Sequence, residues 1–130
     1  MTSEAALTAA AQKMVLAEIE KLDTSSAVNG FMLNGQRVWL DKATRVGLMN
    51  STSIAKAMGQ PTTTLWLGDM KLVVECDKAI QLLSALEMYA LECFNVTAAH
   101  KKAVSEMSTV EEVLAYDYTA GYPEMLEMRI

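Results

Sequence analysis

Two stretches decide the fold of this chain: GFMLNGQRVWLDK, residues 30–42, and TLWLGDMKLVVECDK, residues 64–78. Each contains a turn dipeptide between two apolar segments, Asn34-Gly35 in the first and Gly68-Asp69 in the second. Asn-Gly suits a type I′ turn, in which both central residues have positive φ, and Gly-Asp suits a type II′ turn. Both turn types join antiparallel strands through a two-residue loop, so the sequence predicts two β-hairpins.

Each hairpin leads into an Asp-Lys pair that is typical of a helix start, Asp41-Lys42 and Asp77-Lys78. The first of these helices ends at Gly59, with Pro61 shortly after it. The second helix is long and apolar nearly all round in its first half, so other elements must cover it. Its residues at spacings of three and four form a seam that favours packing within the chain: Leu83, Leu86, Ala90, Cys93, Thr97, His100, Val104 and Met107.

These elements predict an α+β fold. We expect the two β-hairpins, with strands near residues 28–33, 36–40, 62–67 and 70–75, to form a four-stranded antiparallel sheet. The sheet would pack against the long C-terminal helix, with additional helices before and between the hairpins.

The first helix is expected from a cap at Thr2 or Ser3 to about Leu22, and it is amphipathic. A connector follows it, so residues 1–26 are predicted as an N-terminal helix with its connector and residues 27–130 as a single α+β domain. That domain ends in a short apolar tail, which is long enough to dock on the body or on a partner.

Composition and charge exclude several partners. Apolar residues make up 52% of the sequence, but no apolar run is long enough to cross a bilayer. The net charge of −5 comes from the C-terminal part, where six acidic residues after Lys102 face Arg129 alone. We therefore expect neither nucleic acid nor membrane as a partner, because both require clustered basic residues. The start of the chain lacks the basic segment of a signal peptide, so we expect cytoplasmic synthesis in the host.

Residues with chemical potential are few. Cys76 and Cys93 lie in apolar surroundings without a metal-ligand spacing, and His100 is the single histidine. Cys93 and His100 share a helix face, but seven residues separate them, or about 10 Å of helix, which is too far for a direct hydrogen bond. We therefore predict no catalytic residue, no metal site and no cofactor, and hence a protein that is not an enzyme.

Some residues are candidates for an interaction surface instead, because Trp and Arg are enriched at binding hot spots and Met adapts to irregular contacts. For the two tryptophans, core packing is the favoured interpretation and an interaction surface is the alternative. The candidate residues are Trp39, Trp66, Arg37, His100, Met125 and Met128.

A family resemblance rests on five motifs: GxRVWLDKATR, AKAMG, TLWLGD, AAHKKAV and STVEEVLAYD. Together they span about residues 30–117, and they resemble a prophage-associated domain of unknown function that occurs in phage tail and tail-fibre proteins. The resemblance implies a role in the virion structure or in tail assembly, and it carries no catalytic residue.

The expected function is therefore that of a non-enzymatic phage tail protein, structural or assembly-related, that acts through protein contacts. Its partners would be further copies of itself or other tail components, and the chain would remain in the cytoplasm or enter the virion. The alternative is a small-ligand binding module with an apolar pocket between the sheet and the long helix, lined by Trp39, Trp66 and Tyr89.

Overall fold

A computed structural model describes residues 3–130, and they form two compact units that interleave along the chain. The first unit comprises the described residues up to Val28 together with Glu92–Pro123, and the second comprises Asn29–Leu91 with Glu124–Ile130. Helix α3, Cys76–Ser105, contributes its second half to the first unit and its first half to the second. The predicted domains, 1–26 and 27–130, are contiguous instead, and that division stays a prediction.

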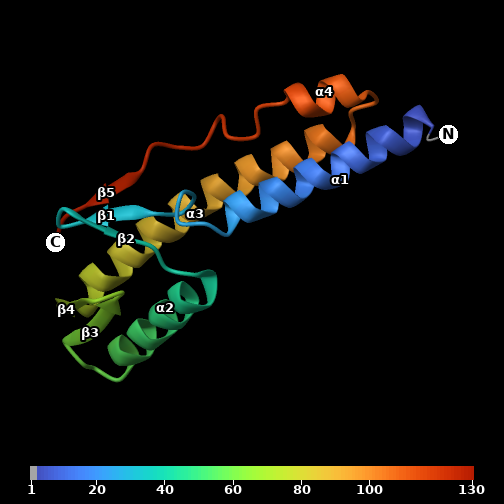
Figure 1. Cartoon of the computed structure of the whole chain (residues 1–130). Coiled ribbons are helices and arrows are strands. Elements are labelled where there is room, and N and C mark those ends of the chain that lie inside the picture. Colours follow the sequence, from blue (N-terminus) through green and yellow to red (C-terminus); the bar gives the residue numbers. More distant parts are fainter. Residues whose placement is uncertain (1–2) are drawn as a thin grey trace. The chain divides into compact units, whose positions relative to one another are not determined.

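The first unit is helical. Helix α1, Glu4–Asp23, begins where Ser3 caps it by accepting a hydrogen bond from the Ala6 N–H, as expected. It runs alongside the second half of α3 (Figure 1). At the end of α3, the Gln12 side-chain amide of α1 donates to the carbonyl oxygens of Val104 and Met107 at 3.0 and 2.9 Å. The Val104 carbonyl also accepts from the Met107 N–H, so Gln12 adds a second donor there and joins α1 to the turn that ends α3.

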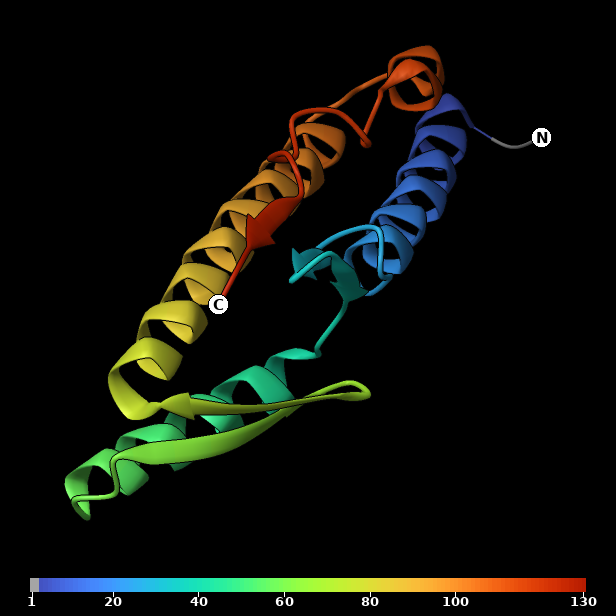
Figure 2. The same ribbon diagram turned by 90° about the vertical axis from the view of Figure 1, so that its left-hand side faces the viewer.

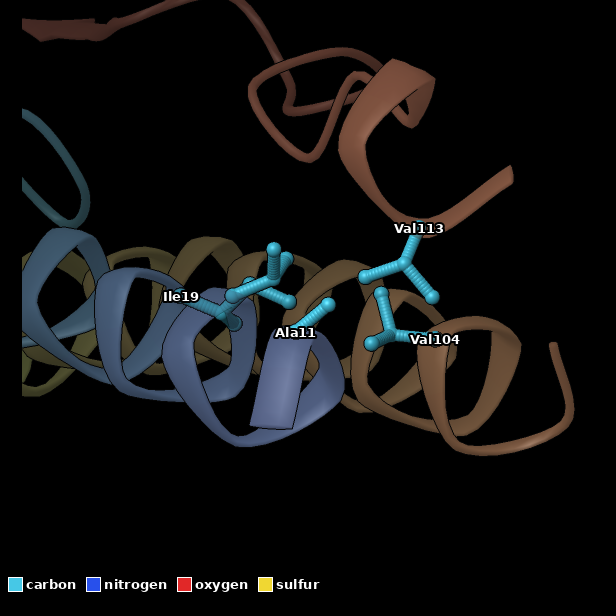
Figure 3. Packing of buried hydrophobic residues seen from close by; sticks show 5 residues of the cluster. Ala11, Ile19, Val104 and Val113 are labelled. Carbon is cyan, nitrogen blue, oxygen red and sulfur yellow. The ribbon is translucent and has the colours of Figure 1, made fainter. Parts of the chain in front are cut away.

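Helix α4, Val110–Ala115, closes the core of this unit. Its cap is Thr109, whose side-chain hydroxyl accepts from the Glu112 N–H. Figure 3 shows the apolar side chains that meet between α1, α3 and α4. The buried cluster consists of Ala11, Val15, Ile19, Val104 and Val113. Helix packing within the chain along the second half of the predicted seam is thereby confirmed.

The second unit contains a three-stranded sheet in the order β2-β1-β5. Strands β1, Phe31–Leu33, and β2, Gln36–Val38, form the predicted first hairpin, with Phe31 opposite Val38. Strand β5, Leu126–Met128, pairs with β1 in parallel. The turn residue Asn34 holds β5 through two hydrogen bonds: its N–H donates to the Met128 carbonyl and its Oδ1 accepts from the Ile130 N–H, both at 2.9 Å.

The second hairpin of this unit is a separate two-stranded sheet. Strands β3, Thr62–Leu67, and β4, Met70–Glu75, have the predicted bounds. Helix α2, Lys42–Ala57, packs against β3 (Figure 2) and is capped by Asp41, as expected. Its glycine at position 47 does not break it.

The predicted four-stranded sheet is wrong. The two hairpins lie in different sheets, because the free edge of β1 is taken by β5 in the apolar tail and not by the second hairpin. The long helix is also central in the chain rather than C-terminal, since α4 and β5 follow it. Helix α3 begins at Cys76, so Asp77 lies in its first turn and not at the cap position. The α+β class itself holds.

Candidate functional site

The second hairpin presents an exposed face that carries a tryptophan near its turn. Trp66 of β3 is 58% exposed and Val73 of β4 is 66% exposed. Side chains alternate between the two faces of a strand, and Leu65, Leu67 and Val74 occupy the opposite, buried face. The Lys71 ammonium lies 6.0 Å from the centre of the Trp66 ring, within the range of a cation-π interaction. We call the residues Thr62, Thr64, Trp66, Lys71, Val73 and Glu75 the hairpin face.

Further exposed apolar side chains lie on the helices. Ile54 and Met58 follow each other at one helical turn at the end of α2, and Met88, Leu91 and Phe94 follow at intervals of three on α3. Residues at such intervals share one side of a helix. Exposed apolar groups that are clustered in this way are typical of surfaces that bind other proteins.

The structure separates the residues predicted for an interaction surface. Arg37, Trp39 and Met125 are exposed in the second unit, as is Trp66, which belongs to the other sheet. Arg37 lies in the sheet row of Met32 and Glu127, whereas Met128 lies one row away. Successive rows point to opposite faces of a sheet, so Arg37 and Met128 do not contribute to one surface.

His100 is buried, with 8% of its surface exposed, in the first unit. Its Nε2 lies 2.7 Å from the Ala120 carbonyl oxygen, and its Nδ1 contacts the Tyr116 hydroxyl. A carbonyl only accepts, so Nε2 carries a proton and donates it; in the neutral ring Nδ1 then accepts from Tyr116. Both ring nitrogens are thus engaged with the segment that follows α4, and neither is directed to Cys93.

A second polar chain lies beside His100. Thr97 donates from its hydroxyl to the Asp23 carboxylate at 2.9 Å, and its oxygen lies 2.7 Å from the Tyr122 hydroxyl. Because the single Thr97 proton is already donated, Tyr122 must donate to Thr97. Burial raises the pKa of Tyr122 above its ordinary value of 10.0, and the neighbouring Asp23 carboxylate adds to this rise. The network ties the end of α1, the middle of α3 and residues 116–122 together.

An open pocket of about 430 Å³ lies between the first turns of α3 and strand β5 with the residues after it. Its lining is formed by Lys78, Gln81, Leu82, Met128, Arg129 and Ile130. The sequence predicted a ligand pocket with a different lining, namely Trp39, Trp66 and Tyr89. Of those residues, Tyr89 is buried and donates to the Gly30 carbonyl at 2.8 Å, while Trp39 and Trp66 are exposed.

Comparison with known families gives one match. A family model described as a domain of unknown function, DUF4376, matches residues 9–120, which is most of the chain. The chain belongs to this family. No curated protein and no solved structure matches it.

This DUF4376 domain has no arrangement typical of a metal centre in residues 3–130, where His, Cys, Asp and Glu side chains do not gather in groups of three. Both cysteines are buried thiols, and the Cys76 thiol donates to the Gln60 carbonyl. Over the same described part of the chain, the helices lack a segment with the length and hydropathy required to span a bilayer.

Sequence reasoning missed the polar network of this DUF4376 domain and the pairing of its tail. Asp23, Thr97 and Tyr122 are ordinary surface residue types, and they are far apart in the sequence. A tyrosine-rich segment from Tyr116 to Tyr122 after a short helix was the available signal, because a buried Tyr hydroxyl requires a partner.

Proposed function

We propose that this chain is a non-enzymatic protein of phage tail structure or assembly that acts through protein-protein contacts. Its partners are further copies of itself or other tail components. It is made in the host cytoplasm and either enters the virion or remains behind as an assembly factor. Neither nucleic acid nor membrane is part of this proposal.

The exposed hairpin face is the observation that carries the proposal. A Trp that is 58% exposed, beside a Val that is 66% exposed, leaves apolar area in water that a partner would remove. Each such side chain contributes about 1.5–3 kcal/mol when it is fully buried. The tail-protein part of the proposal is supported by the motif resemblance. The matched family is described as having unknown function, so it does not conflict with a role in tails.

The test uses a lysogen whose prophage encodes this chain. We expect deletion of its gene to give particles with missing or defective tails in negative-stain electron microscopy, and a plasmid copy to restore them. A Trp66→Ser copy should fail to restore them, because it removes the largest apolar group of the hairpin face. Thr64→Ser, a small change on the same face, should restore them. Unchanged yield and tail morphology after deletion would contradict the proposal, and immunoblots of purified particles distinguish a virion component from an assembly factor.

A small-ligand binding module is the second candidate, and the pocket beside β5 favours it. The pocket lies between a sheet and the long helix, and Lys78 and Arg129 give it positive charge for an anionic ligand. Gln81→Trp fills the pocket from an exposed position. This candidate predicts that native mass spectrometry of the protein from its own host detects a bound small molecule, and that Gln81→Trp abolishes it while Trp66→Ser does not.

A further inference from the structure

Strand β4 has an unpartnered edge. Within residues 3–130 the second hairpin is a two-stranded sheet, so β4 pairs with β3 on one side only. Strand edges expose rows of backbone N–H and C=O groups that can pair with another strand. No proline or bulge interrupts the row in β4.

The turn identifies the outward groups. Gly68 has φ of +65° and Asp69 is not among the residues with positive φ, as a type II′ turn requires. In a hairpin with a two-residue loop, the pair that flanks the loop, Leu67 and Met70, exchanges both hydrogen bonds, and hydrogen-bonded pairs alternate from there. The N–H and C=O groups of Lys71 and Val73 and the N–H of Glu75 therefore point away from β3, whereas the Glu75 C=O accepts the first hydrogen bond of helix α3.

These three residues allow the β4 strands of two copies of the chain to pair with each other. In an antiparallel pair of two β4 strands around a two-fold axis at Val73, Val73 lies opposite its own copy. Lys71 then lies opposite Glu75 of the second copy, at both ends of the pair. In this register the two copies of Val73 exchange both of their outward hydrogen bonds and each Glu75 N–H meets the Lys71 C=O of the other copy, and the charged side chains meet on the exposed face with opposite sign.

The chain leaves both charges available for this contact. Neither Lys71 nor Glu75 forms an ion pair with another described residue. The other edge of the hairpin lacks such a match, because the corresponding pair on β3 would set Trp66 opposite Thr62. Charge complementarity thus selects the β4 edge.

We propose that β4 is the interface of a homodimer, in which the β4 strands of two copies pair antiparallel around a two-fold axis at Val73. The proposal rests on the proposed function, a protein that acts through protein contacts, and it names the partner as a second copy of this chain. An interface of this kind is isologous: the same residues serve both sides.

The first experiment measures the mass of the purified full chain by sedimentation equilibrium at up to about 100 µM, a range that detects weak dimers. We expect a dimer. Val73→Pro, which removes an outward N–H at the axis, should give a monomer. Thr64→Pro is the matched control, since it removes an outward N–H from the opposite edge at the same register position, and it should remain a dimer.

The second experiment exchanges the charges, which keeps the test valid if a proline variant does not fold. Lys71→Glu and Glu75→Lys should each weaken the dimer by about tenfold or more, because like charges then face each other at both ends. An equimolar mixture of these two variants should dimerise again. In the mixed dimer one copy carries a negative charge at both positions and the other a positive charge at both, so opposite charges face each other at each end.

A wild-type chain that stays monomeric at these concentrations would overturn the dimer, and so would equal behaviour of the two proline variants. A mixture of charge variants no tighter than its components would overturn the register. These measurements use purified protein alone, so a negative result leaves the particle experiment on tail assembly independent of it.

Discussion

Thr97 uses both roles of its hydroxyl, since it donates to Asp23 and accepts from Tyr122. Thr97 is 3% exposed, whereas Asp23 and Tyr122 are half-buried. We expect Thr97→Val to lower the free energy of unfolding by about 1 kcal/mol, because it leaves a half-buried hydroxyl and a half-buried carboxylate without their protein partner. Urea denaturation followed by circular dichroism measures this difference.

Thr52 of α2 is the matched control for this prediction. It is also buried, but its hydroxyl donates only to the Leu48 carbonyl one turn earlier, at 2.8 Å. That carbonyl also accepts a backbone hydrogen bond in the helix, so Thr52→Val leaves no group without a partner and should cost less than Thr97→Val. Equal costs would show that the network adds nothing beyond burial.

The raised pKa of Tyr122 predicts that the folded chain loses stability at alkaline pH. Burial raises its pKa in the folded chain above 10.0, so above pH 10 the unfolded chain releases this proton first. The folded chain then binds more protons than the unfolded one, and the free energy of unfolding falls as the pH rises through the raised pKa. Below pH 10 the contribution of Tyr122 to the free energy of unfolding does not change with pH.

Urea denaturation between about pH 8 and pH 11 tests whether the free energy of unfolding falls as the pH rises. Tyr122→Phe should be less stable than wild type at pH 8 but should lose less stability on going to pH 11. The pKa of Lys101 is also raised and acts in the same window, but the main cause, its hydrogen bond to Glu20, is present in both chains and cancels in the comparison; only the smallest part of the rise comes from Tyr122. Parallel pH profiles of the two chains would contradict the assignment to Tyr122.

At the scale of elements, two ion pairs join α2 to the first half of α3, and the Arg45–Glu87 pair is the more buried of the two. Arg45 lies 3.1 Å from Glu87; the arginine is buried, whereas the Glu87 side chain is 38% exposed. Removing Glu87 leaves a buried cation, but the exposed position lets water screen it, so we expect Glu87→Ala to cost about 1–2 kcal/mol. The double variant Arg45→Met with Glu87→Ala should be more stable than Glu87→Ala alone, because no buried charge then lacks a partner.

A double-mutant cycle by urea denaturation measures this coupling. Glu106→Ala is the control, since the Lys102–Glu106 pair is exposed on both sides and 4.0 Å apart, and it should change stability little. If the double variant were less stable than Glu87→Ala, Arg45 would stabilise α2 through packing rather than through its charge.

The helices and strands also show how much of the fold could be predicted from the sequence. Turn and cap chemistry is local, and it correctly predicted both hairpins, the bounds of strands β3 and β4, and the Asp41 cap. Sheet assembly depends on contacts between distant residues, so the partner of β1 was missed. Its partner β5 has three residues, too few for an alternating pattern to be recognised. The network around Thr97 also joins distant residues and was missed, and the core packing that the sequence favoured for Trp66 is wrong, since this side chain is 58% exposed.

At the scale of the whole molecule, the two units share one continuous helix. Helix α3 passes from the second unit to the first between Leu91 and Glu92. Helix formation is cooperative, since each hydrogen-bonded turn supports the next, so fraying of α3 in one unit shortens the helix available to the other. The fold therefore couples the stabilities of the two units through the backbone of α3.

A substitution in one unit with a probe in the other tests this coupling. Val104 is fully buried in the core of the first unit, whereas both tryptophans, Trp39 and Trp66, belong to the second. We expect Val104→Ala to lower the unfolding free energy by about 2 kcal/mol and to shift the tryptophan-fluorescence transition together with the circular dichroism transition. Leu114→Ala, on the exposed side of α4 in the first unit, should shift neither. A fluorescence transition that stays in place while helicity is lost at lower urea would show that the units unfold separately, and that α3 does not transmit stability across its middle.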